Sequence, residues 1–239
     1  MPLPKIATPT YELELPSTGK KIQYRPFLVK EEKLLVLALE SENTREITTA
    51  IKNVLKSCIK TRGIKVEALP TFDIEYLFLN IMGKSVGEEL DVNIICPDDG
   101  ETTVPVQINI DNIKIQRPEG HNSKIQLDDD ILMELKYPSL EEFIKNNFDL
   151  EDQNQLEQSF DLIASCIESV YTADDVWTTA DCTKKEIIEF LEQMNSRQFK
   201  EIEKFFTTMP KLSHEVKVTN PKTKVKSTVI LEGLSSFFA

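Results

Sequence analysis

The most regular alternation of hydrophobic and polar residues lies between residues 90 and 110. Two runs rich in β-branched residues flank a turn-forming segment, Pro97-Asp98-Asp99-Gly100. In the second run, aliphatic residues occupy every other position, at Val104, Val106, Ile108 and Ile110. Such alternation places one face of a strand against a core and the other face in water. The pattern predicts a central β-hairpin, with Gly100 supplying the positive φ of its turn.

Pro105 interrupts the second strand of this hairpin. Proline has no backbone N–H to donate to a neighbouring strand, so we expect the strand to lie at a sheet edge or to carry a bulge. Alternating residues predict two further hairpins, one over residues 11–24 with Gly19 at its turn, and one over residues 214–231 with its turn at residues 219–222. Between residues 111 and 136 the same pattern predicts short strands, separated by the acidic turn 128–130.

Helical periodicity accounts for most of the remaining chain. The first helix begins near Lys30, and its apolar run Leu34 to Leu39 is too wide for a surface stripe, so we expect this helix to be well buried. Capping residues and apolar spacing predict further helices. One helix is capped by Asn43 or Thr44 and ends by Gly63, and the next begins at Thr71 and ends near Gly83. A further helix begins at Ser139, which forms a capping box with Glu142. The last three predicted helices cover residues 154–169, residues 184–195 with Asp181 or Thr183 as the cap, and residues 196–207.

This order of elements indicates an α+β fold in which amphipathic helices pack on short antiparallel hairpins, with the central hairpin around residues 90–110. We expect an N-terminal hairpin with helices (1–84), a central β region (85–136) and a helical segment with the C-terminal hairpin (137–239). A chain of 239 residues is long enough for these segments to form one or two compact domains.

The charge of the chain is unevenly distributed. The net charge is −12, with +4 over residues 1–70, −19 over residues 71–182 and +3 over residues 183–239. Solvated helix faces explain this pattern most simply, although docking of the ends on the acidic middle, or two partners with different surfaces, would also produce it. A nucleic-acid groove needs clustered Lys and Arg, so we expect no nucleic-acid partner.

The hydrophobic segments, the N-terminal residues and the cysteines indicate the cellular compartment of the protein. No apolar run approaches the roughly 20 residues that span a bilayer, and the start MPLPKIATP lacks the layout of a signal peptide. We therefore expect no membrane span and no export. The four cysteines, Cys58, Cys96, Cys166 and Cys182, are scattered, and we expect reduced thiols that are partly buried.

The sequence contains no motif that is typical of a metal site or of a catalytic site. Cys96-Pro97 resembles half of a zinc knuckle, but a second close pair of Cys or His ligands is missing, and residues 128–130 lack the spaced carboxylates and glycine of a calcium loop. The only histidines are His121, in a loop expected to be exposed, and His214, at the start of a strand. Since nucleophilic catalysis needs a base beside the nucleophile, we predict no enzyme, no cofactor, no metal and no catalytic residue. Trp177, in a polar connection, is interpreted as a boundary residue that packs one face, in preference to a ligand platform.

Both ends of the chain resemble a known family. The similarity lies in YELELPSTGKKIQYRPFLVKEEKLLVLALES near the start, and in QFKEIEKFFTTM followed by PKLSHEVKVTNPKTKVKSTVILEGLSSFF at the end. These segments resemble the baseplate hub assembly proteins of T-even-like contractile-tailed bacteriophages, including cyanobacterial relatives. Some relatives have a CPxCG-like turn where this chain has CPDDG, which argues against a metal role for the turn here.

The resemblance implies a non-enzymatic protein of phage tail morphogenesis that helps to build the baseplate hub in the host cytoplasm. It implies other hub proteins as partners, and it leaves open whether the protein stays in the virion as a permanent structural subunit and whether it forms a homo-oligomer. We expect partners to bind the exposed edge of the central hairpin, at Val104 and Val106, and the terminal aromatic pair, Phe237 and Phe238.

Overall fold

The computed structural model of the chain describes residues 6–41, 43–142 and 155–233, and it has the predicted α+β fold. The contacts divide the chain into two compact units. Unit 1 comprises residues 1–66, 72–116 and 211–239, and unit 2 comprises residues 67–71 and 117–210. This division differs from the contiguous segments 1–84, 85–136 and 137–239 expected from the sequence, because each unit combines segments that are distant in the chain.

Unit 1 begins with the predicted N-terminal hairpin. Strand β1 (Tyr11–Glu14) pairs with β2 (Lys21–Tyr24) in antiparallel register, and Gly19 has a φ of +69° in the turn. Ser17 in this turn donates to the buried carboxylate of Asp73, in the first turn of helix α3 (Thr71–Val86). The hairpin is therefore attached to α3, which supplies many of the buried aliphatic and aromatic residues of unit 1.

Helix α1 (Val29–Glu40) corrects the prediction of a well-buried helix. Leu34 and Leu37 are 52% and 53% exposed, and Val36 and Leu39 are exposed to a similar extent. The helix buries only a narrow side that includes Ala38 and Glu31, whose carboxylate pairs with Arg25 at 2.9 Å. The aliphatic residues are spread around the helix, and the rest of unit 1 covers only one side of it.

Helix α2 (Thr44–Cys58) begins where the sequence predicted. The side chain of Asn43 accepts hydrogen bonds from the N–H groups of Arg45 and Glu46, so Asn43 is the N-cap. The helix buries Val54 and Leu55 and ends at Cys58, before the predicted stop at Gly63. The 3-10 helix η1 (Val66–Ala68) follows, where the chain passes between the units.

The central hairpin of unit 1 has the predicted form. Strand β3 (Glu89–Ile95) pairs with β4 (Thr103–Asn109) without a register shift, and Gly100 has a φ of +68°. Among the described residues this sheet consists of β3 and β4, so Pro105 lies in an edge strand, one of the two predicted alternatives. The 3-10 helix η2 (Ile110–Asn112) leads from β4 to β5 (Lys114–Gln116).

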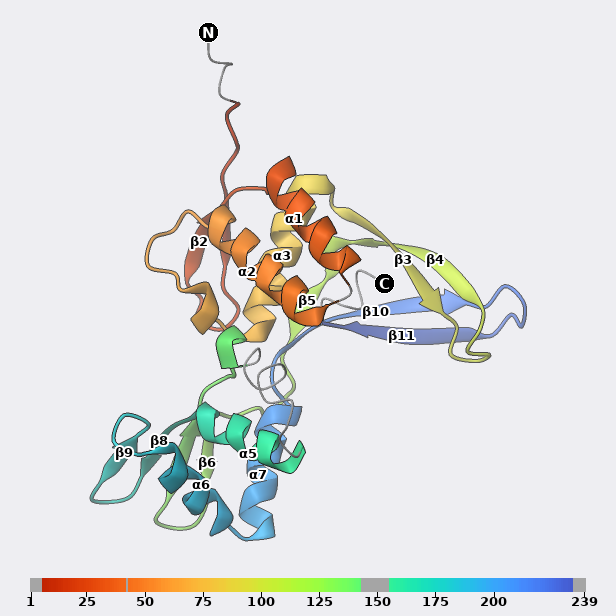
Figure 1. Cartoon of the computed structure of the whole chain (residues 1–239). Coiled ribbons are helices and arrows are strands. Elements are labelled where there is room, and N and C mark those ends of the chain that lie inside the picture. The colour runs from red at the N-terminus through yellow and green to blue at the C-terminus, as the bar shows by residue number, and fades with distance from the viewer. Residues whose placement is uncertain (1–5, 42, 143–154, 234–239) are drawn as a thin grey trace. The chain divides into compact units, whose positions relative to one another are not determined.

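The C-terminal hairpin is the third predicted hairpin. Strand β10 (Lys211–Thr219) pairs with β11 (Lys226–Glu232) on one side and with β5 on the other, which gives a sheet of order β11-β10-β5. The β3–β4 and β10–β11 hairpins extend in the same direction from the helical part of unit 1 (Figure 1). β4 lies beside β10.

Unit 2 contains a four-stranded antiparallel sheet of order β6-β7-β8-β9 and the helices that cover it. Its elements are β6 (Lys124–Gln126), β7 (Leu132–Leu135), α5 (Gln155–Cys166), β8 (Ile167–Tyr171), β9 (Val176–Thr178), α6 (Lys184–Glu192) and α7 (Ser196–Thr207). Its core joins residues of the sheet to residues of all three helices, among them Met133, Ile163, Leu191 and Phe205.

Several boundaries in unit 2 differ from the prediction. The helix expected over residues 154–169 ends at Cys166, because Ile167 pairs with Leu135 of β7 and starts strand β8. Trp177 lies in β9 instead of a polar connection, and it pairs with Val170. The helix expected over residues 184–195 ends at Glu192.

Two predicted candidate caps in unit 2 are confirmed. Of the alternatives Asp181 and Thr183, Thr183 caps α6, where it forms a capping box with Glu186. Ser139 and Glu142 exchange the predicted hydrogen bonds, at 2.7 and 3.2 Å, but the body of the helix that they would start lies outside the described residues.

Candidate functional site

The residues predicted to bind partners are placed in part by the structure. Val104 and Val106 lie on β4 and are half-buried, on the same face as the buried Ile108. Phe237 and Phe238 lie outside the described residues. Partner binding by these four residues therefore stays a prediction.

The turn of the central hairpin, CPDDG, holds a pair of carboxylates with several hydrogen-bond donors. The carboxylate of Asp99 accepts hydrogen bonds from the hydroxyl and the N–H of Thr102, within its own turn. Asp98 and Asp99 both accept hydrogen bonds from the side-chain amide of Asn220, at 2.9 to 3.1 Å. Thr223 also donates its hydroxyl to Asp98. The turns of the β3–β4 and β10–β11 hairpins are thereby joined.

These hydrogen bonds have an electrostatic consequence. The donors from Thr102, and then the amide of Asn220, lower the pKa of Asp99 well below its ordinary value, because they stabilise the charged carboxylate. Asn220 itself is 1% exposed, and its side-chain oxygen accepts from the N–H groups of Lys222 and Thr223. Both ends of this buried amide are therefore satisfied. The sequence did not indicate this junction, because Asn220 and Asp98 are 122 residues apart.

Cys96, beside this turn, is buried, and burial, followed by the charges of Asp98 and Asp99, raises the pKa of its thiol. The cysteines are all free, and three of them are buried. Burial raises the pKa of Cys58 to about 11 and that of Cys166 to about 12. Across residues 6–41, 43–142 and 155–233, no group of three or more His, Cys, Asp or Glu side chains is arranged to hold a metal ion.

His121 is not an exposed loop residue, contrary to the prediction. Its ring stacks on Tyr137 and packs at a tilt against Phe205, with centroids at 5.6 and 5.1 Å, and the Tyr137 and Phe205 rings also contact each other. The nitrogens of His121 contact the hydroxyls of Thr208 and Tyr137 at 2.9 and 3.0 Å. Burial lowers the pKa of His121, which favours the neutral imidazole. These contacts make His121 part of the core edge of unit 2. His214 is half-buried in β10, opposite Leu231.

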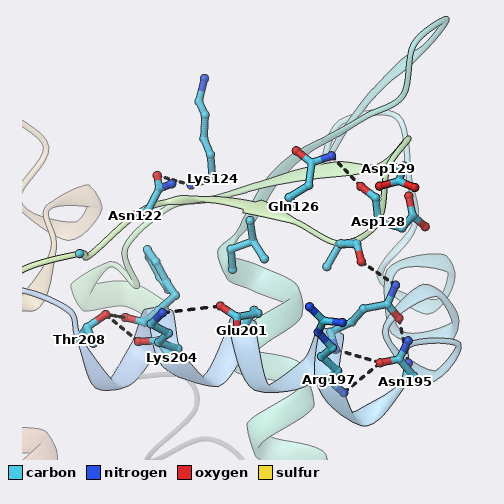
Figure 2. A pocket seen from close by; sticks show the side chains of 15 residues that line it. Asn122, Lys124, Gln126, Asp128, Asp129, Asn195, Arg197, Glu201, Lys204 and Thr208 are labelled. Carbon is cyan, nitrogen blue, oxygen red and sulfur yellow. Dashed lines mark hydrogen bonds and ion pairs between the residues drawn. The ribbon is translucent and has the colours of Figure 1, made fainter.

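Unit 2 has an open polar cleft of about 700 Å³ (Figure 2). One wall is strand β6 and its flanking turns, with Asn122, Lys124 and Asp128, and the other wall is helix α7, with Arg197 and Glu201. All of these side chains are exposed to solvent. Cationic and anionic groups are mixed along the cleft, so it offers hydrogen bonds and charges of both signs to a polar surface.

The same unit also has a smaller, apolar groove of about 290 Å³. It is formed by Trp177, Val170 and Ile167 of the sheet and by Ile187 and Phe190 of α6. Trp177 is 42% exposed and covers one side of the groove, so it packs one face as the sequence predicted.

Helix α1 exposes four aliphatic residues in its last turns. We call Leu34, Val36, Leu37 and Leu39 the α1 face; each is about half exposed. They form two pairs at a spacing of three residues, Leu34 with Leu37 and Val36 with Leu39, which flank the buried strip of the helix. Val29, at the start of the helix, is 79% exposed. Clustered exposed apolar residues mark interaction sites more often than single ones do. The sequence showed the apolar run itself, but it was interpreted as a sign of burial.

Three comparisons relate the chain to known proteins. The model of the family described as "T4 bacteriophage base plate protein" matches residues 8–239, which is nearly the whole chain. Neither the curated proteins nor the solved structures include a match. In the part of the chain that the structure describes, no helix is long and apolar enough to cross a membrane.

Proposed function

Because the chain belongs to the family of T4 bacteriophage base plate proteins, we propose that it is an assembly factor for the baseplate hub that acts by binding hub proteins and not by catalysis. Its site of action would be the host cytoplasm, where the baseplate is built. The observation that carries this proposal is the α1 face, whose aliphatic side chains are about half exposed.

The physical argument concerns the free energy of the exposed apolar surface. Burying apolar side chains against a partner is favourable by roughly 25 cal/mol per Å² removed from water. Leu34, Val36, Leu37 and Leu39 would supply such area from a single helix, through two pairs of residues three positions apart that a partner can cover around the exposed side of α1. Supporting contacts would come from the side chains of Val104 and Val106 on β4 and from Phe237 and Phe238, the residues predicted from the sequence.

The test is capture of hub proteins of the same phage by the full chain in co-expression. We expect Leu37→Glu, which places a charge in the Leu34–Leu37 pair of the α1 face, to reduce capture of the bound hub protein by at least about tenfold, as for a central interface residue. Leu37 is 53% exposed, so the melting temperature should fall by only a few degrees.

The matched control is Lys200→Glu, which adds the same negative charge to an exposed position of helix α7 and leaves the α1 face intact. Equal capture by wild type and Leu37→Glu, or failure of every hub protein to bind, would refute the proposal. Mass spectrometry of purified virions separates the assembly factor from the alternative, a permanent structural subunit of the hub, because only a subunit is present in stoichiometric amount.

A further inference from the structure

Strand β11 presents an open edge. It pairs with β10 on one side, and the sheet order β11-β10-β5 leaves its other side unpaired among the described strands. Two backbone hydrogen bonds show which residues of β11 point their N–H and C=O groups toward β10. Asn220 N–H donates to Val225 O, and Gly233 N–H donates to Leu212 O. Since hydrogen-bonded pairs alternate along antiparallel strands, the backbone groups of Lys226, Thr228 and Ile230 point away from β10.

The edges of β3, β4 and β9 carry features that block strand addition, and β11 has none of these features. Pro105 removes an N–H from the outer side of β4, and Glu89 and Asp91 occupy outward positions of β3. On β9, the Asp181 carboxylate accepts from Thr178 N–H, and Asp181 N–H donates to Thr178 O. β11 is seven residues long and has neither a proline nor a bulge.

The sequence of β11, KSTVILE, is complementary to itself in the antiparallel direction. When two copies are aligned about Val229, Lys226 of each copy lies opposite Glu232 of the other, and Thr228 lies opposite Ile230. These are the residues whose backbone groups point outward, so each of these pairs exchanges two main-chain hydrogen bonds. If one copy of β11 is moved by two residues along the other, the main-chain hydrogen bonds can still form, but Lys226 and Glu232 no longer lie opposite each other.

We propose that β11 pairs with β11 of a second copy of this chain, antiparallel about a two-fold axis at Val229. The strands of both copies then form a continuous sheet of order β5-β10-β11-β11-β10-β5. A two-fold interface requires a surface that matches itself, and the alternation of Lys226, Thr228, Ile230 and Glu232 has this property.

The side chains on the outer face of β11 fit this pairing. Ile230 is 60% exposed, and a second strand would cover it with Thr228 of the second copy and, diagonally, with the second Ile230. Glu232 already lies 3.5 Å from Lys211 Nζ, which holds its carboxylate on this face. In the dimer the same carboxylate also faces Lys226 of the second copy.

The proposal is tested by sedimentation equilibrium of the full chain over a range of micromolar concentrations. Wild type should dimerise reversibly. Lys226→Glu and Glu232→Lys each place like charges at both ends of the paired strands, and each should weaken the dimer by about tenfold or more. An equimolar mixture of the two variants should regain dimers at the wild-type level, because each variant restores the charge pairs of the other.

The matched control is Lys222→Glu, in the turn of the same hairpin, which should dimerise as wild type does. A second variant, Thr228→Pro, removes an outward N–H without removing a bond to β10, and it should abolish dimers while its circular dichroism spectrum is unchanged.

Monomeric wild type at all concentrations would overturn the proposal, as would dimers that neither charge variant weakens or variants that fail to recover on mixing. Capture of a hub protein by β11 of a monomeric chain would assign the edge to another protein and would equally overturn it. Leu37→Glu should leave the dimer unchanged, so this test is independent of the proposed function.

Discussion

Buried carboxylates in unit 1 hold secondary-structure elements together. Glu31 is 2% exposed and pairs with Arg25, which ties the end of β2 to the start of α1. Its carboxylate also accepts from Leu28 N–H at 2.7 Å. Burial alone would favour the neutral acid, but the hydrogen bonds from Arg25 and Leu28 outweigh it and lower the pKa of Glu31. The charge is thus retained because it is fully partnered.

Replacing Glu31 by Gln should lower the free energy of unfolding by about 2 kcal/mol, because the largely buried guanidinium of Arg25 loses its counter-charge. Urea unfolding of the full chain measures this loss. Glu32→Gln is the matched control, since Glu32 is exposed in the same first turn of α1 and its loss should cost less than about 0.5 kcal/mol. Equal effects of the two substitutions would contradict the role assigned to the pair.

At the scale of elements, the two long hairpins of unit 1 are joined at their turns. Asn220 bridges to Asp98 and Asp99, and Thr102 fixes the orientation of Asp99 within its own turn. A hairpin is marginally stable by itself and needs a further partner. The junction therefore stabilises both hairpins, and with them the strand β11 at which we propose dimerisation.

This junction predicts a dependence of stability on pH. The pKa of Asp99 is lower in the folded than in the unfolded chain, so its contribution is present above the unfolded value, near about 4, and is lost as the pH falls toward the lowered folded value. The difference in melting temperature between wild type and Asp99→Asn should be constant at neutral pH and should shrink below about pH 4.

Thr102→Val is the companion variant, because it keeps the Asp99 carboxylate and removes its hydroxyl donor. We expect its melting temperature to depend less on acidic pH than that of wild type. If the curves for wild type and Asp99→Asn stay parallel throughout the acidic range, the charged carboxylate does not support the junction.

At the scale of the whole molecule, most of unit 2 is an insertion into unit 1. The chain leaves unit 1 after Gln116, at the end of β5, and returns at Lys211, at the start of β10. Gln116 and Lys211 are direct partners in the β5–β10 ladder. The ends of the inserted segment are therefore adjacent, an arrangement that permits insertion of a domain without disturbing the host sheet.

The segment 117–210 should therefore fold when it is expressed alone, because every residue of its hydrophobic core cluster, from Ile125 to Phe205, lies inside it. Thermal unfolding followed by circular dichroism should be cooperative. Its stability should be lower than that of a version that retains residues 67–71, because the hydrogen bond from Leu140 N–H to Leu69 O is lost. A non-cooperative transition would show that its core requires unit 1.

The sequence by itself determined the features that depend on neighbouring residues. The hairpin turns at Gly19 and Gly100 were predicted correctly, and the caps Asn43 and Thr183 and the edge position of Pro105 were each one of two predicted alternatives. Each of these features is governed by backbone geometry and by hydrogen bonds within a few residues. The resemblance of the two ends also indicated the baseplate family, which the comparison shows.

Only the tertiary structure decided which surfaces are covered. The apolar run of α1 is compatible with burial or with exposure, and Ile167 is compatible with a helix or a strand until Leu135 of β7 pairs with it. The stacking of His121 and the bonds of Asn220 to Asp98 join residues distant in sequence. Local pattern fixes which face of an element is apolar, but the packing of distant segments determines what lies against that face.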